Sequence, residues 1–129
     1  MTNKEIVQSA FENFGKGNIA GIMDIMSDDI VWNMSGPDII PFAGHRRGKA
    51  EVMDFFAQIA GSQNMEKFEP QSFVSEGDRV VAFGVAVATS KKTGKRATNN
   101  WAMSWLFKDG KAIEYNNYSD TYALAESFM

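Results

Sequence analysis

The chain has 129 residues, of which 44% are hydrophobic and 22% are charged, and its formal net charge is −3. These values predict one soluble globular domain over residues 1–129, large enough to bury a full core. The chain contains no cysteine and a single histidine. Disulfides, thiolate metal sites and a cysteine nucleophile are therefore excluded, and we expect neither a metal nor a cofactor.

The same numbers restrict the partners and the location. A negative net charge argues mildly against a nucleic-acid partner. No apolar run approaches the ~20 residues of a membrane span. The polar segment 2–5 predicts that there is no signal peptide, and the lack of cysteine fits a reducing compartment. We expect a cytoplasmic protein that binds neither nucleic acid nor a membrane.

The first third of the chain predicts two helices. Thr2 and Glu5 have the spacing of a capping box, and apolar residues follow at helical spacing until Gly15 ends the pattern. Asn18 can cap a second, short helix. Its apolar stripe consists of Ile19, Ile22, Met23 and Met26.

A short strand, a long loop and a third helix come next. Residues 30–34 predict the strand, and residues 49–60 predict the helix, which Gly61 ends. The segment 36–48 between them is rich in glycine and proline. It is too long for a simple connection, and such loops are often functional.

Four strands separated by turn residues make up most of the remainder, at about residues 67–76, 80–89, 97–108 and 111–120. Pro70 marks a bulge or an edge position in the first of them. A short tail follows. Helices grouped at one end and strands at the other predict an α+β domain, in which three N-terminal helices pack on one face of a curved antiparallel sheet.

The last hairpin suggests a pocket. Asp109-Gly110 is a strong two-residue turn signal, because both residues must accept positive φ. A two-residue loop pairs Lys108 with Lys111, and continuing this register places aromatic and polar side chains on one face. They are Trp101, Met103, Trp105 and Tyr118 with Asn99, Glu114, Asn116 and Asp120. A buried carboxylate is costly in a packed core, so this mixture favours a pocket for a small organic molecule.

The preceding strand supports the same face. If Ser90 pairs with Lys95, the small residues Ala82, Gly84, Ala86 and Ala88 line the aromatic face and leave room for a ligand. The opposite face is apolar, with Val81, Phe83, Val85, Val87, Leu106, Ile113 and Tyr115. Such a face is not left in water, so we expect a homodimer through it. A register slip of one residue would exchange the two faces.

Four polar residues are candidates for catalysis. Burial near Trp101 would raise the pKa of Asp120 and suit it to acid/base work, although an aspartate just past a strand also commonly caps a helix. Tyr118 and Asn116 can donate hydrogen bonds to a carbonyl or enolate oxygen, or simply satisfy each other. His45, in the glycine-rich loop, is either catalytic or solvated.

The candidate pocket walls are Trp32, Trp101, Met103, Trp105 and Ala86. Each of these side chains can equally belong to the core.

The order of elements and three short blocks resemble a known superfamily. The blocks are Asp29-Ile30-Val31-Trp32, the segment 42–48, and Asp109-Gly110-Lys111 with Tyr118-Ser119-Asp120. They are similar to the nuclear transport factor 2-like (NTF2-like) superfamily, and within it to the SnoaL-like and ketosteroid-isomerase-like group. The resemblance covers the whole chain and implies a cone-shaped α+β barrel, a deep apolar pocket and usually a homodimer.

The resemblance also suggests one catalytic residue, and it shows that the catalytic residues of the ketosteroid isomerases have no counterpart in this chain. SnoaL-like cyclases use an aspartate at the end of the last strand as acid/base, and Asp120 matches it. Ketosteroid isomerases use an aspartate after the first strand and a tyrosine on the first helix. This chain has Asn33 to Gly36 at the first place and Phe11 or Phe14 at the second, so steroid isomerisation is not implied.

Two functions follow from the sequence. The first is cofactor-free acid/base chemistry, a cyclisation or isomerisation, on a small hydrophobic carbonyl compound, as in a polyketide cyclase-like or isomerase-like enzyme. The alternative is a domain of the same fold that binds a small ligand or a partner without catalysis.

Overall fold

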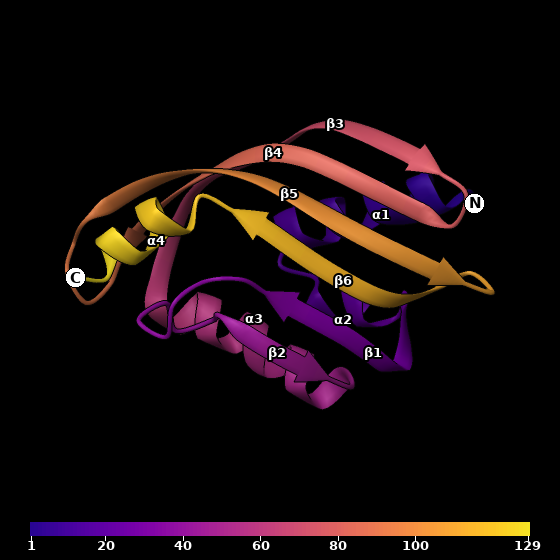
Figure 1. Ribbon diagram of the computed structural model, residues 1–129, viewed down its shortest axis with the longest axis horizontal. Helices are drawn as coiled ribbons and strands as arrows, with labels where there is room; N and C mark the ends of the chain where they lie inside the picture. Colours follow the sequence, from indigo (N-terminus) through magenta and orange to yellow (C-terminus); the bar gives the residue numbers. More distant parts are fainter.

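The protein is described by a computed structural model of residues 1–129, in which four helices pack on a six-stranded sheet (Figure 1). The elements, in chain order, are α1 (Asn3–Gly15), α2 (Ile19–Met23), β1 (Met26–Met34), β2 (Gly44–Arg47), α3 (Lys49–Ser62), β3 (Gln63–Glu76), β4 (Arg79–Ser90), β5 (Arg96–Lys108), β6 (Lys111–Ser119) and α4 (Thr121–Ser127). None of the helices combines the length and the apolar character needed to span a bilayer.

The two predicted N-terminal caps are confirmed. The Thr2 hydroxyl accepts a hydrogen bond from the Glu5 backbone N–H at 3.1 Å, and the Glu5 carboxylate accepts one from the Thr2 N–H at 2.9 Å. The Asn18 side chain accepts from Gly21 N–H at 3.0 Å. These bonds satisfy donors that the first turn of a helix leaves unpaired.

The sheet is a curved layer in the order β2-β1-β6-β5-β4-β3. Strands β3 to β6 form the predicted meander, while β1 and β6 run parallel, which differs from the antiparallel sheet that we expected. These two strands are far apart in the chain, so no tight turn forces them to run antiparallel. The edge strands β2 and β3 do not pair with each other, and the resulting α+β cone stays open.

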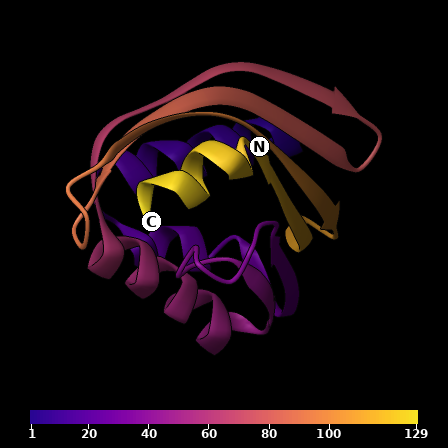
Figure 2. The ribbon, with the colours of Figure 1, turned by 60° about the vertical axis from the view of Figure 1, so that its left-hand side comes forward.

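The helices lie on the concave side of the sheet (Figure 2). α1 contacts β3 and β4, α3 contacts β1 and β2, and α4 contacts β5. The convex side carries no helix, and we call it the outer face. The concave side and the helices enclose a continuous core of 24 buried residues.

Two elements were not predicted. Four residues of the glycine-rich segment form β2, which pairs with β1 from Val31 opposite Arg47 to Met34 opposite Gly44. So short an edge strand shows no alternation from which it could be recognised. The tail forms α4, with Asp120 as its N-cap.

The predicted register of the last hairpin is wrong beyond its second pair, Phe107 with Ala112. The turn is as expected, with φ of 51° at Asp109 and 78° at Gly110, and Lys108 pairs with Lys111. The register then shifts by one residue, because Ile113 is an extra residue between the pairs Phe107–Ala112 and Leu106–Glu114. Such a β-bulge moves every later side chain of β6 to the opposite face.

Candidate functional site

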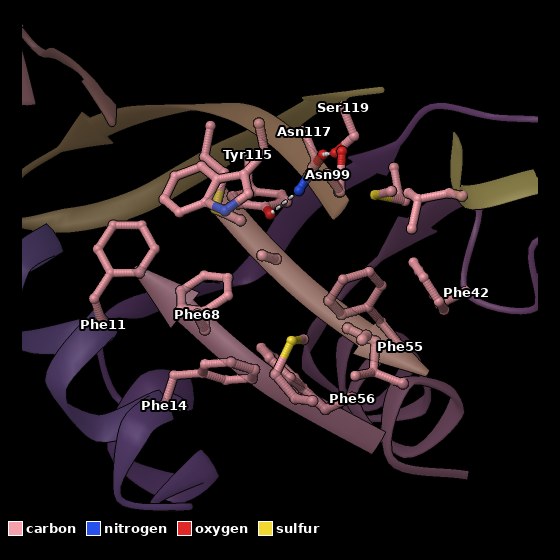
Figure 3. A pocket seen from close by; sticks show the side chains of 18 of the residues that line it. Phe11, Phe14, Phe42, Phe55, Phe56, Phe68, Asn99, Tyr115, Asn117 and Ser119 are labelled. Carbon is pink, nitrogen blue, oxygen red and sulfur yellow. Dashed lines mark hydrogen bonds between the residues drawn. The ribbon is translucent and has the colours of Figure 1, made fainter. Parts of the chain in front are cut away.

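A pocket opens between the helices and the concave side of the sheet (Figure 3). It is lined by 24 residues, of which 20 are hydrophobic. Its volume is about 90 Å³, measured over the positions that the centre of a water-sized sphere can take. At the ~10–15 Å³ that one water needs on this measure, the pocket has room for roughly six to nine waters, and so for a molecule of two or three rings.

Aromatic rings from several elements form one wall of the pocket: Phe11 and Phe14 of α1, Phe55 and Phe56 of α3, and Phe68 of β3 (Figure 3). The five residues that we expected as pocket walls, Trp32, Trp101, Met103, Trp105 and Ala86, all belong to the lining. They come from β1, β5 and β4. The predicted register of β4 and β5 is confirmed, with Gly84 opposite Trp101 and Ala82 opposite Met103.

The Trp101 ring is held by stacking and by a glycine. It stacks on Phe11 at 5.5 Å and on Phe68 at 5.1 Å between ring centroids. Its far edge lies over Gly84, where an added Cβ would stand 2.3 Å from the ring and 2.4 Å from the Glu69 carbonyl oxygen. Only glycine allows the indole to lie this close to the strand.

The few polar lining residues include Asn99, which the sequence placed on this face, and a hydrogen-bonded group that it did not place here: Tyr115, Asn117 and Ser119 (Figure 3). Asn117 Nδ2 donates to the Tyr115 hydroxyl at 2.9 Å, and the Ser119 hydroxyl donates to Asn117 Oδ1. Burial raises the pKa of Tyr115, so its hydroxyl stays protonated. The bulge at Ile113 brings β6 residues of odd number into the pocket, and nothing in the local pattern marks it.

The amide of Asn99 has a fixed orientation. Its Oδ1 accepts a hydrogen bond from the Asp120 backbone N–H at 2.8 Å. The Nδ2 group of Asn99 makes no hydrogen bond within the protein, so it remains free to donate to a ligand.

Three further donors in the lining have no partner. The indole nitrogens of Trp32, Trp101 and Trp105 are buried and make no hydrogen bond within the protein. The three side chains belong to residues that are only 2%, 4% and 3% exposed. A buried donor without a partner costs ~1–3 kcal/mol, so three of them along one pocket are expensive unless a ligand or water accepts from them.

The polar residues proposed for catalysis lie outside the lining. Asp120 is exposed, and its carboxylate accepts a hydrogen bond from Ala123 N–H at 3.1 Å as the N-cap of α4. Tyr118 is 57% exposed. Asn116 and Glu114 point away from the pocket, because the bulge has moved them to the outer face. No carboxylate or imidazole lines the pocket, and no group of three or more such side chains could hold a metal ion.

Asn116 and His45 are instead linked through Asn33 on the outer face. A chain of hydrogen bonds runs from Glu114 through Asn116 and Asn33 to His45, across β6, β1 and β2. Asn116 donates to the Glu114 carboxylate at 2.7 Å, and Asn33 donates to Asn116 at 2.9 Å. The remaining oxygen of Asn33 then accepts from His45 Nδ1. This order gives His45 Nδ1 the role of donor.

The sequence pattern of the SnoaL-like domain matches residues 7–115, most of the chain. No curated protein matches this chain.

Solved structures with the same architecture are numerous. An NTF2-like protein from Burkholderia xenovorans is 28% identical, with 97% of this chain and 94% of that chain covered and a TM-score of 0.87. TerC, co-crystallized with polyporic acid, is 28% identical, with 96% and 95% covered and a TM-score of 0.82. A candidate SnoaL-like polyketide cyclase from Mesorhizobium loti is 23% identical, with 92% and 99% covered and a TM-score of 0.76, which shows the common fold.

Proposed function

Because the chain belongs to the SnoaL-like domain family, within the NTF2-like superfamily, we propose that it binds a small hydrophobic carbonyl compound in the pocket on the concave side of the sheet. One observation carries this proposal: the pocket is a single apolar space in which 20 of 24 lining residues are hydrophobic and the others are uncharged. Pockets of this kind orient an apolar ligand by a few placed polar groups.

The polar group of the lining suits a carbonyl oxygen. The Nδ2 group of Asn99 is free to donate, and the protonated Tyr115 hydroxyl has its own hydrogen to give. A charged ligand would find no counter-charge in the lining, and burying an unpaired charge is unfavourable. The similarity to TerC, which was co-crystallized with polyporic acid, supports a small organic ligand.

Acid/base catalysis at the same site is a second candidate. It is favoured by the position of Asp120, which directly follows the lining residue Ser119 and whose backbone bonds to the lining residue Asn99. A ketone held at Asn99 would form an enolate when a base removed its α-proton. The base must reach that proton, so this function requires the N-terminus of α4 to turn the Asp120 carboxylate toward the pocket.

Calorimetric titration with 1-tetralone, an uncharged two-ring ketone, tests the binding proposal. We expect saturable binding with one site per chain. A lack of saturable binding of both 1-tetralone and the larger 9-fluorenone would overturn the proposal.

Deuterium uptake at the α-carbon of 1-tetralone in D₂O tests the catalytic candidate. If Asp120 removes the proton, the protein accelerates uptake, and Asp120→Asn slows it by ~10²–10⁴-fold while binding persists. The control is Asp38→Asn, an exposed aspartate elsewhere. Binding without accelerated uptake would contradict the catalytic candidate, and the binding proposal would stand.

A further inference from the structure

The balance of hydrogen-bonding groups in the pocket is uneven. The oxygens of Asn99, Asn117 and Tyr115 already accept hydrogen bonds from Asp120 N–H, Ser119 and Asn117 respectively. The groups that remain are mainly donors: the Asn99 amide, the Tyr115 hydroxyl and the three indole N–H groups. The open acceptors are the Gln63 amide oxygen and the Ser119 hydroxyl oxygen, which donates to Asn117 and accepts from no group of the protein.

The tryptophans find no strong acceptor among their neighbours. The centroid of the Trp105 ring lies 5.7 Å from that of Trp32, with an angle of 87° between the two ring planes. The Tyr115 ring lies 4.8 Å away, at an angle of 72°. The Trp101 ring packs against the rings of Phe11 and Phe68. Aromatic faces accept hydrogen bonds only weakly, so these neighbours do not satisfy an indole N–H.

The three indoles also span the pocket. Trp32 of β1 stacks on Tyr115 of β6 at 3.6 Å, and Tyr115 lies opposite Trp105 of β5. Trp101 lies four residues from Trp105 on the same face of β5. At the usual rise per residue of a strand, their Cα atoms are about 13 Å apart. Indole N–H groups without a partner therefore lie at two places along the sheet.

Resting on the proposed function, we infer that the indole N–H groups of Trp32, Trp101 and Trp105 are ligand-binding donors. The pocket then selects uncharged molecules whose polar atoms are acceptors, such as ketones, quinones, esters and lactones. It discriminates against hydrocarbons of the same shape, which leave the donors unpaired, and against amines, which bring further donors and a charge.

Nuclear magnetic resonance of the indole protons tests this inference directly, because the three tryptophans of the chain are the three in the pocket. The ¹⁵N-labelled protein is titrated with 1-tetralone and, separately, with tetralin, which has the same two rings and no oxygen. We expect 1-tetralone to move at least one indole proton signal downfield, and tetralin to move none downfield. The methyl signals of the pocket methionines report occupancy by either probe.

A variant series provides the second measurement. Trp32→Phe, Trp101→Phe and Trp105→Phe each keep a ring and remove one N–H. We expect at least one of them to weaken 1-tetralone binding by about 3- to 10-fold relative to its effect on tetralin, the range of one neutral hydrogen bond. The affinity of each variant for tetralin measures the effect of the smaller ring on packing, so the comparison isolates the contribution of the N–H group.

The outcomes separate this inference from the function on which it rests. If both probes shift the methionine methyl signals and no indole proton moves downfield with the ketone, the inference is overturned and binding in the pocket stands. If neither probe shifts those methyl signals and 9-fluorenone shifts none of them either, the proposed function fails and this inference fails with it.

Discussion

At the scale of single residues, a buried phenol rather than a carboxylate stands in the pocket. Tyr115 is 2% exposed and bonded to Asn117, whereas Asp120 caps a helix at the surface. The register predicted from the sequence placed Asp120 in the pocket and Tyr115 on the opposite face of the sheet. Which of them enters the pocket depends on a register that residue types alone do not encode.

Tyr115 gives a prediction about pH. Burial raises its pKa above the ordinary value of 10.0, so the native state keeps a proton that the unfolded state loses. The unfolding free energy should therefore fall as pH rises above 10.0, by up to ~1.4 kcal/mol per pH unit from this group. Tyrosinate absorbance of the native protein should show a titration step displaced above 10.0 that belongs to Tyr115.

Matched substitutions identify the group. Tyr115→Phe should remove the displaced step, whereas Tyr118→Phe, at a position 57% exposed, should leave that step in place. A folded protein without the displaced step would contradict the buried position of Tyr115.

At the scale of elements, the sequence predicted most of the helices and strands, because their signals are local. Thr2 with Glu5, Asn18 and Asp109-Gly110 act within three residues of themselves. The bulge at Ile113 is different, since it depends on how β6 meets β5 and β1 together. For that reason the even-numbered residues of β6 were predicted in the pocket, and the odd-numbered ones lie there.

The contact between β4 and β5 gives a second prediction. Gly84→Ala would place a Cβ against the Trp101 ring and the Glu69 carbonyl, which must move apart. We expect a loss of ~1–3 kcal/mol of unfolding free energy, measured in urea. The control is Gly61→Ala in α3, where nothing lies within 4 Å and alanine should stabilise the helix by up to ~1 kcal/mol. Equal effects of the two substitutions would contradict the close approach of Trp101.

At the scale of the whole molecule, the two faces of one sheet have different roles. The concave side carries the pocket, while the outer face carries an apolar row on β4 that includes Phe83, 42% exposed. No helix covers this row. We propose, as the sequence suggested, that a second copy of the chain covers it.

Light scattering checks this proposal. We expect a mass of about twice 14.3 kDa at micromolar concentration, and a monomer for Phe83→Glu. Met53→Glu, which adds the same charge at a 47% exposed position of α3, should remain a dimer. A wild-type protein of one chain's mass would refute the dimer and leave the pocket untouched.

The central claim is that the ligand binds on the concave side, and blocking that side tests it most directly. Ala86 lines the pocket, whereas its neighbour Val85 points to the outer face. The measurement is the affinity for 1-tetralone of folded Ala86→Trp and Val85→Trp proteins, with folding checked by circular dichroism. The account predicts that Ala86→Trp abolishes binding and that Val85→Trp retains it. Unchanged binding by folded Ala86→Trp, or loss of binding only in Val85→Trp, would contradict it.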